Sequence, residues 1–320
     1  MRIISLLPSA TEIVYALGLG DSLVGVTHEC DYPADAKTRP VVTRSVLDHS
    51  DATSAEIDHA VSNQLANGLS IYELDTALLA ALQPDLILTQ ALCDVCAVSY
   101  DAVQHAVHDV TAQMGGIAPR VLSLEPSSLH DIFQTIEIVG DLTGTTGRAA
   151  EVLADLQRRV EHVRAHAVSV RRRPRVACLE WVDPLYGPGH WMPELVQIAG
   201  GTPGLGQARK ESRQIAWSDI IAFAPEIMLI APCGFGLERA VEETMQALPH
   251  RAGWDALPAV RAGRVYVADG NAYFSRPGPR IVESLEMLAA FIHPETCAGW
   301  GPREAWTTLA STPAQNIHAE

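Results

Sequence analysis

The chain has 320 residues, of which 48% are hydrophobic and 19% are charged. This length suits two domains, and the composition provides enough apolar side chains for folded cores and excludes an intrinsically disordered chain. The formal net charge is −15, from 38 acidic and 23 basic residues. Such an excess of acidic residues argues against a nucleic-acid partner, because that binding depends on Lys and Arg neutralising phosphates.

The chain has no apolar run that approaches the roughly 18 residues needed to cross a bilayer, so we expect no membrane insertion. Residues 1–8 resemble a structural strand and are too short for the apolar core of a secretory signal. We therefore expect a cytoplasmic protein, or a periplasmic or extracellular one if a leader has been removed. Six cysteines with one C-x-x-C pair favour a reducing compartment over a disulfide framework.

Strand and helix patterns alternate along residues 1–126. Short apolar runs predict strands at 2–7, 23–27, 86–89 and 120–124. Apolar residues at helical spacing predict the intervening helices, at 13–17, about 53–67, 75–82 and a last one ending near 107. This alternation predicts a parallel sheet with helices on both faces.

Residues 127–172 carry no strand signal. Their apolar spacing predicts one helix around 132–139 and a second over 146–167. At 1.5 Å per residue the second helix is about 33 Å long, which is enough to cross a whole domain. We expect it to be a spine between two lobes.

The second half repeats the pattern of the first. It predicts strands at 175–179, 227–231 and 264–268, and helices at 193–199, 217–223, 237–248 and 279–292. Residues 296–320 carry little pattern and are expected to be a loosely packed tail. The predicted organisation is an N-terminal βα lobe at 1–126, a helical spine at 127–172, a C-terminal βα lobe at 173–295 and a tail at 296–320.

Five short motifs have the order and spacing of a known family. They are RIISLLPSATE at 2–12, VGV followed by DYP within 24–33, LQPDLI at 82–87, PEI at 225–227 and RPGPR at 276–280. Over about residues 2–293 the chain resembles the type III, or helical-backbone, substrate-binding proteins of ABC importers, which carry the Fe/B12 periplasmic-binding domain. Within that family it is most similar to the cobalamin-binding branch. The resemblance implies an α/β fold of two lobes, each with a central parallel sheet flanked by helices, joined by one long spine helix, with a ligand cleft between the lobes.

The resemblance also implies an ABC permease as a partner, which members of the family contact through one surface Glu in each lobe. The corresponding positions lie near Ala77 and Ser218, and neither is acidic, although Glu73 and Asp219 are close. Whether the chain takes part in import through a permease is therefore an open question. The partner that we expect is a metal-containing small molecule, with the chain acting as its carrier or sensor.

Polar, aromatic and cysteine residues follow the predicted strands, which is where ligands bind in open α/β sheets. In the first lobe these residues are His28, Glu29, Cys30, Tyr32, Cys93 and Cys96. In the second half they are Glu180, Trp181, Tyr186, Cys233, Phe235, Tyr273 and Arg276. We predict that the residues able to bind metal or protons converge on one gap between the lobes: His28, Cys30, Cys93, Cys96, Glu180 and Cys233.

Thiolates and imidazoles are suited to zinc, iron, copper or an iron–sulfur cluster. Cys93 and Cys96 form the C-x-x-C pair, and Cys30, Cys233 and His28 provide further donors. Three interpretations of these cysteines stay open: direct metal ligation, apolar lining of a pocket, and a redox switch. His28 is also a candidate axial ligand to the cobalt of a corrinoid, with a hydrogen-bonded structural role as the alternative.

Aromatic and basic residues complete the predicted ligand site. Trp181 and Tyr186 offer flat apolar faces with a hydrogen-bonding edge, which suit a large planar macrocycle. Trp191 is equally well explained as a core residue. Arg276 and Arg280 are candidates for contacts with carboxylates or amides of the ligand, although Arg280 is more simply explained as a cap of the last helix.

A zinc-dependent hydrolase is the competing enzyme hypothesis, with Glu29 or Glu180 as general base beside His28 and cysteine ligands. The chain lacks H-E-x-x-H and G-x-S-x-G motifs and a Gly-rich phosphate loop after its first strand, so we do not expect an enzyme. The sequence therefore predicts a corrinoid-binding carrier or sensor. Direct binding of a metal ion or iron–sulfur cluster is the first alternative and the hydrolase is the second.

Overall fold

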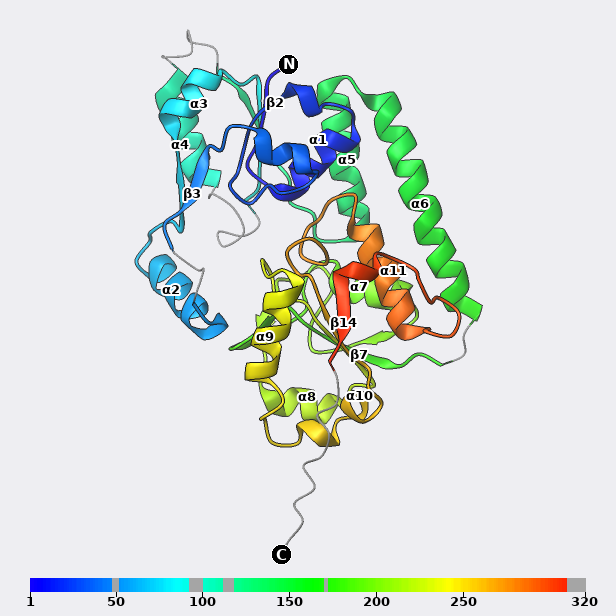
Figure 1. Ribbon diagram of the computed structural model, residues 1–320. Helices are drawn as coiled ribbons and strands as arrows, with labels where there is room; N and C mark the ends of the chain where they lie inside the picture. Colours follow the sequence, from blue (N-terminus) through cyan, green and yellow to red (C-terminus); the bar gives the residue numbers. More distant parts are fainter. Residues whose placement is uncertain (48–51, 92–99, 112–117, 170–171, 310–320) are drawn as a thin grey trace, which may run out of the picture. The chain divides into compact units, whose positions relative to one another are not determined.

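The computed structural model describes residues 1–47, 52–91, 100–111, 118–169 and 172–309. The chain folds into two compact units (Figure 1). Unit 1 consists of Met1–Arg159 and Arg276–Val282, and unit 2 of Val160–Ser275 and Glu283–Glu320. The chain therefore returns to unit 1 for a short segment close to its end. Within the described part of the chain, none of the helices combines the length and the apolar character needed to cross a membrane.

The sheet of unit 1 has four parallel strands in the order β2-β1-β5-β6. Their bounds are Ile3–Ser5 for β1, Leu23–Val26 for β2, Leu86–Thr89 for β5 and Arg120–Ser123 for β6. Ile3 and Ile4 point to opposite faces of the sheet and are both fully buried, as expected for a parallel sheet that is covered on both faces. All four predicted strands are therefore confirmed, β5 with the predicted bounds and the other three with slightly shorter ones.

The helices of unit 1 begin where the chain offers a suitable first residue. They are α1 (Pro8–Ala16), α2 (Ser54–Ala66), α3 (Thr76–Leu82), α4 (Tyr100–Thr111) and α5 (Leu129–Thr143), with 3₁₀ turns at Gly20–Ser22 and Ala34–Thr38. The first helix begins at Pro8 and not at residue 13, because proline suits the first helical position, where no N–H partner is required. At the start of α2, Thr53 and Glu56 form a capping box.

One antiparallel pair of strands in unit 1 has no counterpart in the predicted elements. It pairs β3 (Thr43–Ser45) with β4 (Tyr72–Leu74), and α2 lies between the two strands in the chain. Each strand is three residues long, which is too short for an alternating pattern to distinguish it from a loop. Just before β3, Val41 pairs with Val26 of β2, which brings Thr43 beside the residues that follow β2.

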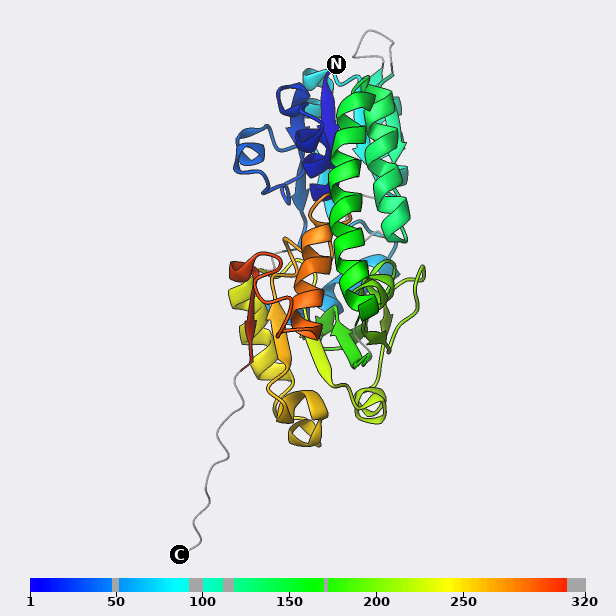
Figure 2. The ribbon, with the colours of Figure 1, turned by 90° about the vertical axis from the view of Figure 1, so that its right-hand side faces the viewer.

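The predicted long helix is confirmed as α6, which spans Thr146–Ser169 (Figure 2). It follows α5 after Gly144, whose positive φ of 71° ends the preceding helix. A Cβ at Gly140 would lie 2.6 Å from the Cβ of Ala149, so the two small residues allow α5 and α6 to pack closely. The boundary between the two units falls inside α6.

Unit 2 is built on a five-stranded sheet in the order β10-β7-β12-β13-β14. The parallel strands are β10 (Thr202–Pro203), β7 (Arg175–Leu179), β12 (Ile227–Ile230) and β13 (Val265–Ala268). A smaller antiparallel sheet contains β11 (Arg213–Gln214), β9 (Leu185–Gly187) and β8 (Trp181–Val182). The three strands predicted for this half are confirmed as β7, β12 and β13.

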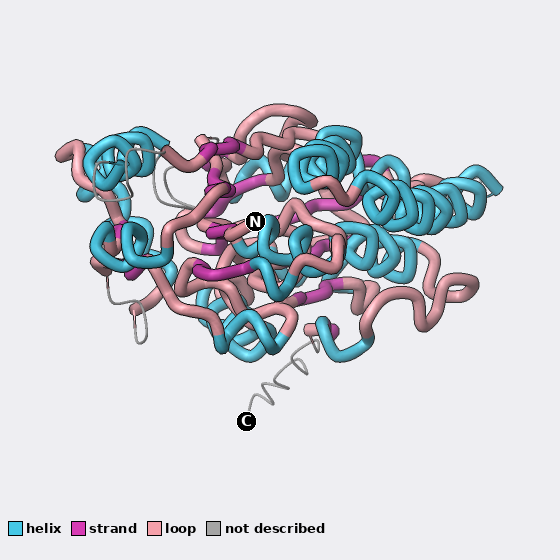
Figure 3. Tube along the Cα trace, turned by 90° about the horizontal axis from the view of Figure 1, so that it is seen from above, coloured by secondary structure: helices cyan, strands magenta, loops and turns pink. Residues whose placement is uncertain are grey.

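Helices lie around the strands in each unit, and Figure 3 draws them in cyan against the magenta strands. In unit 2 they are α7 (Met192–Ile198), α8 (Trp217–Phe223), α9 (Leu237–Ala247), α10 (Pro258–Arg261) and most of α11 (Ile281–Ile292), with 3₁₀ turns at Trp254–Ala256 and Arg303–Ala305. The predicted fold class, α/β with helices flanking parallel sheets, is confirmed for both units.

The expectation of a loose tail from residue 296 is wrong for the part that the structure describes. Residues 306–308 form β14, which pairs antiparallel with β13. The Trp306 ring packs edge-on against Tyr266 and Phe291, with ring centroids 5.6 and 4.9 Å apart. A three-residue strand held by one aromatic cluster leaves no periodic pattern in the sequence.

Candidate functional site

The loop after β2 carries four of the predicted site residues, His28, Glu29, Cys30 and Tyr32. The carboxyl ends of parallel strands share one edge of a sheet, so this loop lies at the edge where open α/β sheets bind ligands. Cys30 is buried, His28 is partly buried, and Glu29 and Tyr32 are exposed. This loop of unit 1 is therefore anchored by a buried residue, while two of its side chains are exposed to solvent.

Two threonines hold the His28 side chain. Its Nδ1 lies 2.8 Å from the Oγ1 of Thr43, and the same oxygen accepts the backbone N–H of His28 at 3.1 Å. The Thr43 hydroxyl in turn donates to the Oγ1 of Thr27 at 2.8 Å. Thr43 was not among the predicted site residues, because it reaches His28 through a pairing of Val41 with Val26 that the sequence pattern does not reveal.

Cys30 is a buried thiol in a hydrogen bond. Its Sγ lies 2.9 Å from the Oγ1 of Thr11, on α1. Burial raises the pKa of the Cys30 thiol to about 11, although the Thr11 contact opposes that rise. A thiol that stays protonated is a poor metal ligand. For Cys30, this environment favours the interpretation as an apolar, packed side chain.

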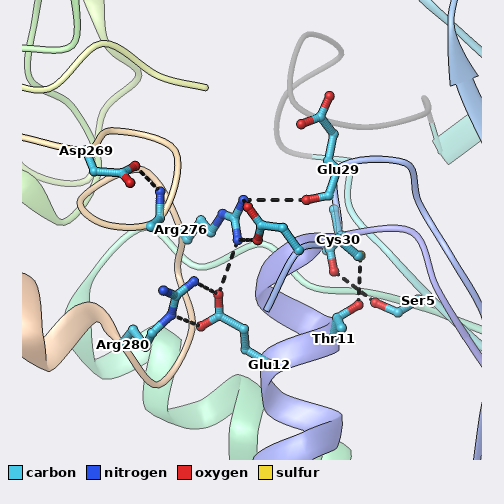
Figure 4. Close-up of polar contacts among 11 residues, drawn as sticks. Ser5, Thr11, Glu12, Glu29, Cys30, Asp269, Arg276 and Arg280 are labelled. Carbon is cyan, nitrogen blue, oxygen red and sulfur yellow. Dashed lines mark hydrogen bonds and ion pairs between the residues drawn. The ribbon is translucent and has the colours of Figure 1, made fainter. Parts of the chain in front are cut away.

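Two arginines and two carboxylates form a network of ion pairs in unit 1, and Figure 4 labels Glu12, Arg276 and Arg280 of this network. Arg280 donates to both carboxylate oxygens of Glu12, at 3.0 and 2.5 Å. Arg276 donates to the Asp31 carboxylate at 2.5 and 3.1 Å and lies 3.5 Å from Glu12. The Arg280 guanidinium also lies 3.9 Å from the centroid of the Tyr32 ring. The network therefore fixes the loop after β2 against α1.

The Arg276 side chain is buried, whereas a side chain that contacts a ligand is expected to be accessible. Its side chain is only 6% exposed, and its NH2 group also approaches the carbonyl oxygen of Glu29 at 3.5 Å. Arg280 pairs with Glu12 and is not simply a helix cap. The sequence signal for this pairing is Glu12 itself, an acidic residue among the apolar residues of α1, but nothing in the sequence names its partner.

In unit 2, backbone hydrogen bonds connect the residues that follow β7, β12 and β13. The N–H of Cys233 donates to the carbonyl of Glu180 at 3.0 Å. The carbonyl of Phe235 accepts from the N–H groups of Gly270 and Asn271, at 3.0 and 3.1 Å. Glu180, Cys233 and Phe235 are therefore brought together with the residues that directly follow β13.

An aromatic pair lies at this joined edge. The rings of Trp181 and Phe235 are 4.9 Å apart between centroids, at an interplanar angle of 49°. Phe235 is buried and Trp181 is partly exposed, with its Nε1 donating to the carbonyl of Asp183 at 3.1 Å. Tyr186 pairs with Trp181 across β8 and β9, and it is also partly exposed. Unit 2 thus offers a supported aromatic surface.

Glu180 is the acidic residue beside that surface. Its carboxylate accepts the N–H of Gly189 at 3.2 Å and a hydrogen bond from the hydroxyl of Ser212. Burial raises the pKa of Glu180 to about 7, against the opposing effect of both hydrogen bonds. The side chain therefore ties the loops at 189 and 212 together and exchanges a proton near neutral pH.

Residues 3–272 match a family described as Periplasmic binding protein. The chain belongs to this family. It is 24% identical over 301 residues to the "Uncharacterized ABC transporter substrate-binding lipoprotein" of Bacillus subtilis, covering 92% of this chain and 81% of the relative. It is 21% identical over 300 residues to the "Vitamin B12-binding protein" of Vibrio cholerae, covering 91% and 88%. Its structure is similar to that of a "Periplasmic Heme Binding Protein from Pseudomonas aeruginosa", with a TM-score of 0.66, 20% identity and coverage of 92% and 93%.

These similarities confirm the predicted family and its fold. The chain is therefore a solute-binding protein of the periplasmic-binding-protein type. The relatives' names include vitamin B12 and heme, which are both metal-containing macrocycles. The expectation of a cytoplasmic protein receives no support from relatives, one of which is named a lipoprotein.

The predicted site residues fall into three groups in this periplasmic binding protein. His28, Glu29, Cys30, Tyr32 and Arg276 belong to unit 1, where they lie on or against one loop. The second group belongs to unit 2, where Glu180, Cys233 and Phe235 follow joined strand ends, Trp181 and Tyr186 lie in β8 and β9, and Tyr273 follows β13. Cys93 and Cys96 lie outside the described residues. The convergence of all these residues on one gap stays a prediction.

The structure also bears on the hypothesis that side chains of this protein bind a metal ion directly. Among the residues that the structure describes, no three His, Cys, Asp or Glu side chains are grouped closely enough to hold a metal ion.

Trp191 is a core residue of unit 2. It is buried, and its Nε1 donates to the carbonyl of Phe274 at 2.7 Å.

Proposed function

We propose that this periplasmic binding protein binds a corrinoid and acts as its carrier or sensor. The observation that carries the proposal is the aromatic pair at the joined strand ends of unit 2. Phe235 packs against Trp181, and the partly exposed indole is proposed to offer an apolar face to a large macrocycle. The similarity to proteins named for vitamin B12 supports a corrinoid as the macrocycle.

The loop after β2 in unit 1 is proposed to contact the same class of ligand. It presents His28, Glu29 and Tyr32, while Cys30, Arg276 and Arg280 hold it in place. A loop fixed in advance by buried hydrogen bonds and ion pairs loses little conformational entropy when a ligand binds. This pre-organisation suits a binding protein.

A titration of the purified protein tests the proposal. Cobinamide, cobalamin and hemin would each be added in separate experiments, with binding followed by visible absorbance and by quenching of tryptophan fluorescence. We expect saturable binding of the two corrinoids in preference to hemin. Preferential binding of hemin, or no binding of either corrinoid, would contradict the proposal.

Trp181→Leu and Trp217→Leu provide a matched pair for this titration. Both tryptophans are partly exposed, each donates its Nε1 to a backbone carbonyl, and each packs against one aromatic ring. Only Trp181 lies at the joined strand ends, since Trp217 begins α8. We expect the Trp181 variant to weaken corrinoid binding by roughly tenfold or more, which corresponds to about 1.4 kcal/mol, and the Trp217 variant to bind normally.

The alternative hypotheses give other results with the same protein. A metal ion or iron–sulfur cluster held by the cysteines would be retained by purified protein and lost in a Cys93→Ser, Cys96→Ser variant, as measured by elemental analysis. A zinc hydrolase would contain stoichiometric zinc without a visible chromophore. Either finding would replace the corrinoid proposal.

A permease of the ABC type is the proposed partner, and a periplasmic or extracellular location accompanies it, on the strength of the relative named an ABC transporter substrate-binding lipoprotein. Glu73 and Asp219 are the acidic residues proposed to take part in docking. Glu73 is exposed in β4 and forms an ion pair with Arg44, and Asp219 is exposed in the first turn of α8. Co-purification of wild-type protein with the permease, lost in a Glu73→Gln, Asp219→Asn variant, would test this partner.

A further inference from the structure

The hydrogen bonds around Thr43 determine which nitrogen of His28 carries a hydrogen. A hydroxyl group has one hydrogen to donate and two lone pairs to accept with. The Thr43 hydroxyl donates its hydrogen to Thr27, and one of its lone pairs accepts the backbone N–H of His28. Its remaining contact, 2.8 Å long, is with Nδ1 of His28. Because Thr43 has no second hydrogen, this contact requires a hydrogen on Nδ1.

A hydrogen on Nδ1 leaves Nε2 as the nitrogen whose lone pair is available in the neutral ring. Nε2 is covered, and among the described residues it has no aligned hydrogen-bond partner. A histidine with a purely structural role would be expected to satisfy both ring nitrogens, since a buried polar atom without a partner costs free energy. Here one nitrogen is bound and the other is not.

Glu29 is the charged group next to Nε2. Its Oε1 lies 3.2 Å from Nε2, although the approach lacks the alignment of a hydrogen bond. The Glu29 side chain is 45% exposed. Its carboxylate can therefore move away from Nε2 toward solvent.

We propose that Nε2 of His28 coordinates the metal at the centre of the bound macrocycle, and that Thr43 and Thr27 are positioning residues for this bond. The inference rests on the proposed function and deepens it, because it names the atom that reaches the cobalt. A Co–N bond forms as the Co–O bond to an axial water breaks, the water leaves to solvent, and no electron is transferred. Metal-binding imidazoles commonly donate their other N–H to an oxygen, which fixes the ring and raises its basicity.

Cobinamide in its Co(II) form is the probe that tests the inference. It carries no nitrogenous base of its own, so an axial nitrogen seen in its electron paramagnetic resonance spectrum must come from the protein. We expect a triplet superhyperfine splitting with unlabelled protein, which becomes a doublet when only the histidines carry ¹⁵N. This comparison uses the wild-type chain and needs no substitution.

Three variants then assign the nitrogen and its support. His28→Gln keeps an amide that can donate to Thr43, and we expect it to fold normally and to lose the splitting. Thr43→Val removes the acceptor at nearly constant volume, and we expect it to weaken cobinamide binding by roughly 10- to 100-fold and to reduce the coordinated fraction. Thr43→Ser keeps the hydroxyl and is expected to restore both.

The outcomes separate the inference from the proposed function. Saturable cobinamide binding without nitrogen splitting would overturn the inference and leave corrinoid binding intact. Splitting that persists in the His28 variant would assign the bond to another histidine and also overturn it. An absence of cobinamide binding in wild-type protein would contradict the proposed function, and the inference with it.

Discussion

Glu12 and Arg280 are 268 positions apart in the chain, and they form a bidentate ion pair inside unit 1. The two side chains are only 1% and 10% exposed. Arg276 adds a second guanidinium, which lies 3.5 Å from Glu12 and pairs with Asp31. The segment 276–282 therefore completes a unit whose other residues all precede residue 160.

Breaking this pair from one side should strongly destabilise the protein. Arg280→Met leaves Glu12 buried beside a single, more distant guanidinium, and the loss of one partner of a buried ion pair costs about 3–5 kcal/mol. Urea unfolding followed by circular dichroism would measure the difference in the free energy of unfolding.

Arg44→Met is the matched control, because it breaks an ion pair with Glu73 in which the side chains are 76% and 52% exposed. Exposed pairs contribute about 1 kcal/mol or less. Equal destabilisation by the two variants would contradict a special role for the buried pair. A Glu12→Leu, Arg280→Met double variant should recover part of the loss, because it removes the unpaired buried charge.

A second prediction concerns the crossing of two backbone segments at Gly206. A Cβ added at this position would lie 1.7 Å from the carbonyl oxygen of Pro188, so any side chain must displace the backbone. Gly206→Ala should therefore lower the free energy of unfolding by about 1–3 kcal/mol, the usual cost of overpacking.

Gly147 provides the control for that substitution. It lies in the first turn of α6, and a Cβ there would meet nothing within 4 Å. Gly147→Ala should be neutral or stabilise by up to about 1 kcal/mol, because alanine loses less backbone entropy in a helix. Thermal unfolding of both variants checks the pair, and an undisturbed Gly206 variant would show that the segment moves without cost.

The sequence predicts the parts of this molecule that depend on local pattern. The buried strands β5 and β12 and the long helix α6 follow from runs and spacing of apolar residues that each element must bury. The three-residue strands β3 and β14 do not, because they depend on partners that lie far away in the chain.

The candidate site divides in the same way. The chemistry of the loop after β2 can be predicted, since residues that follow a parallel strand lie at a binding edge. The role of Thr43 cannot be predicted, because it requires the pairing of Val41 with Val26 at the end of β2. The thiol of Cys30 has the same difficulty, because its raised pKa comes from burial, which one sequence does not show.

Glu180 should make the free energy of unfolding depend on pH with an unusual sign. Its pKa is about 7 in the folded protein against an ordinary value of 4.5. Between these values the folded state binds more protons than the unfolded state, so this carboxyl lowers stability as pH rises from about 4.5 to about 7. Glu180→Gln removes the effect and keeps an acceptor for Gly189 and Ser212.

The measurement is the difference in unfolding free energy between the Gln variant and wild type, from urea titrations at several pH values. We expect it to grow in favour of the variant from pH 4.5 to pH 7 and then to level off. Glu226→Gln is the control, because the Arg175 N–H lowers the pKa of Glu226 and its contribution is lost only as pH falls below 4.5. A difference for Glu180 that does not change with pH would contradict the prediction.

His293 should make unit 2 less stable in mild acid. It lies buried just after α11, with its Nε2 hydrogen-bonded to the carbonyl of Ala199 at 3.0 Å. Burial lowers the pKa of His293 from its ordinary 6.5, and His166 and Arg264 act in the same direction, against the opposing effect of the Ala199 carbonyl. The unfolded state therefore binds more protons than the folded state below about pH 6.5, and stability falls as pH falls through that value.

His293→Gln keeps a donor for Ala199 and cannot become charged, so we expect it to lose less stability than wild type between pH 7 and pH 5. The exposed His130 of α5, changed to Gln, serves as the control and should follow wild type. Tryptophan fluorescence during urea unfolding at both pH values measures the slopes, because Trp300 packs against His166 with ring centroids 5.5 Å apart. If all three proteins lose stability equally, His293 is not the group that makes the fold sensitive to acid.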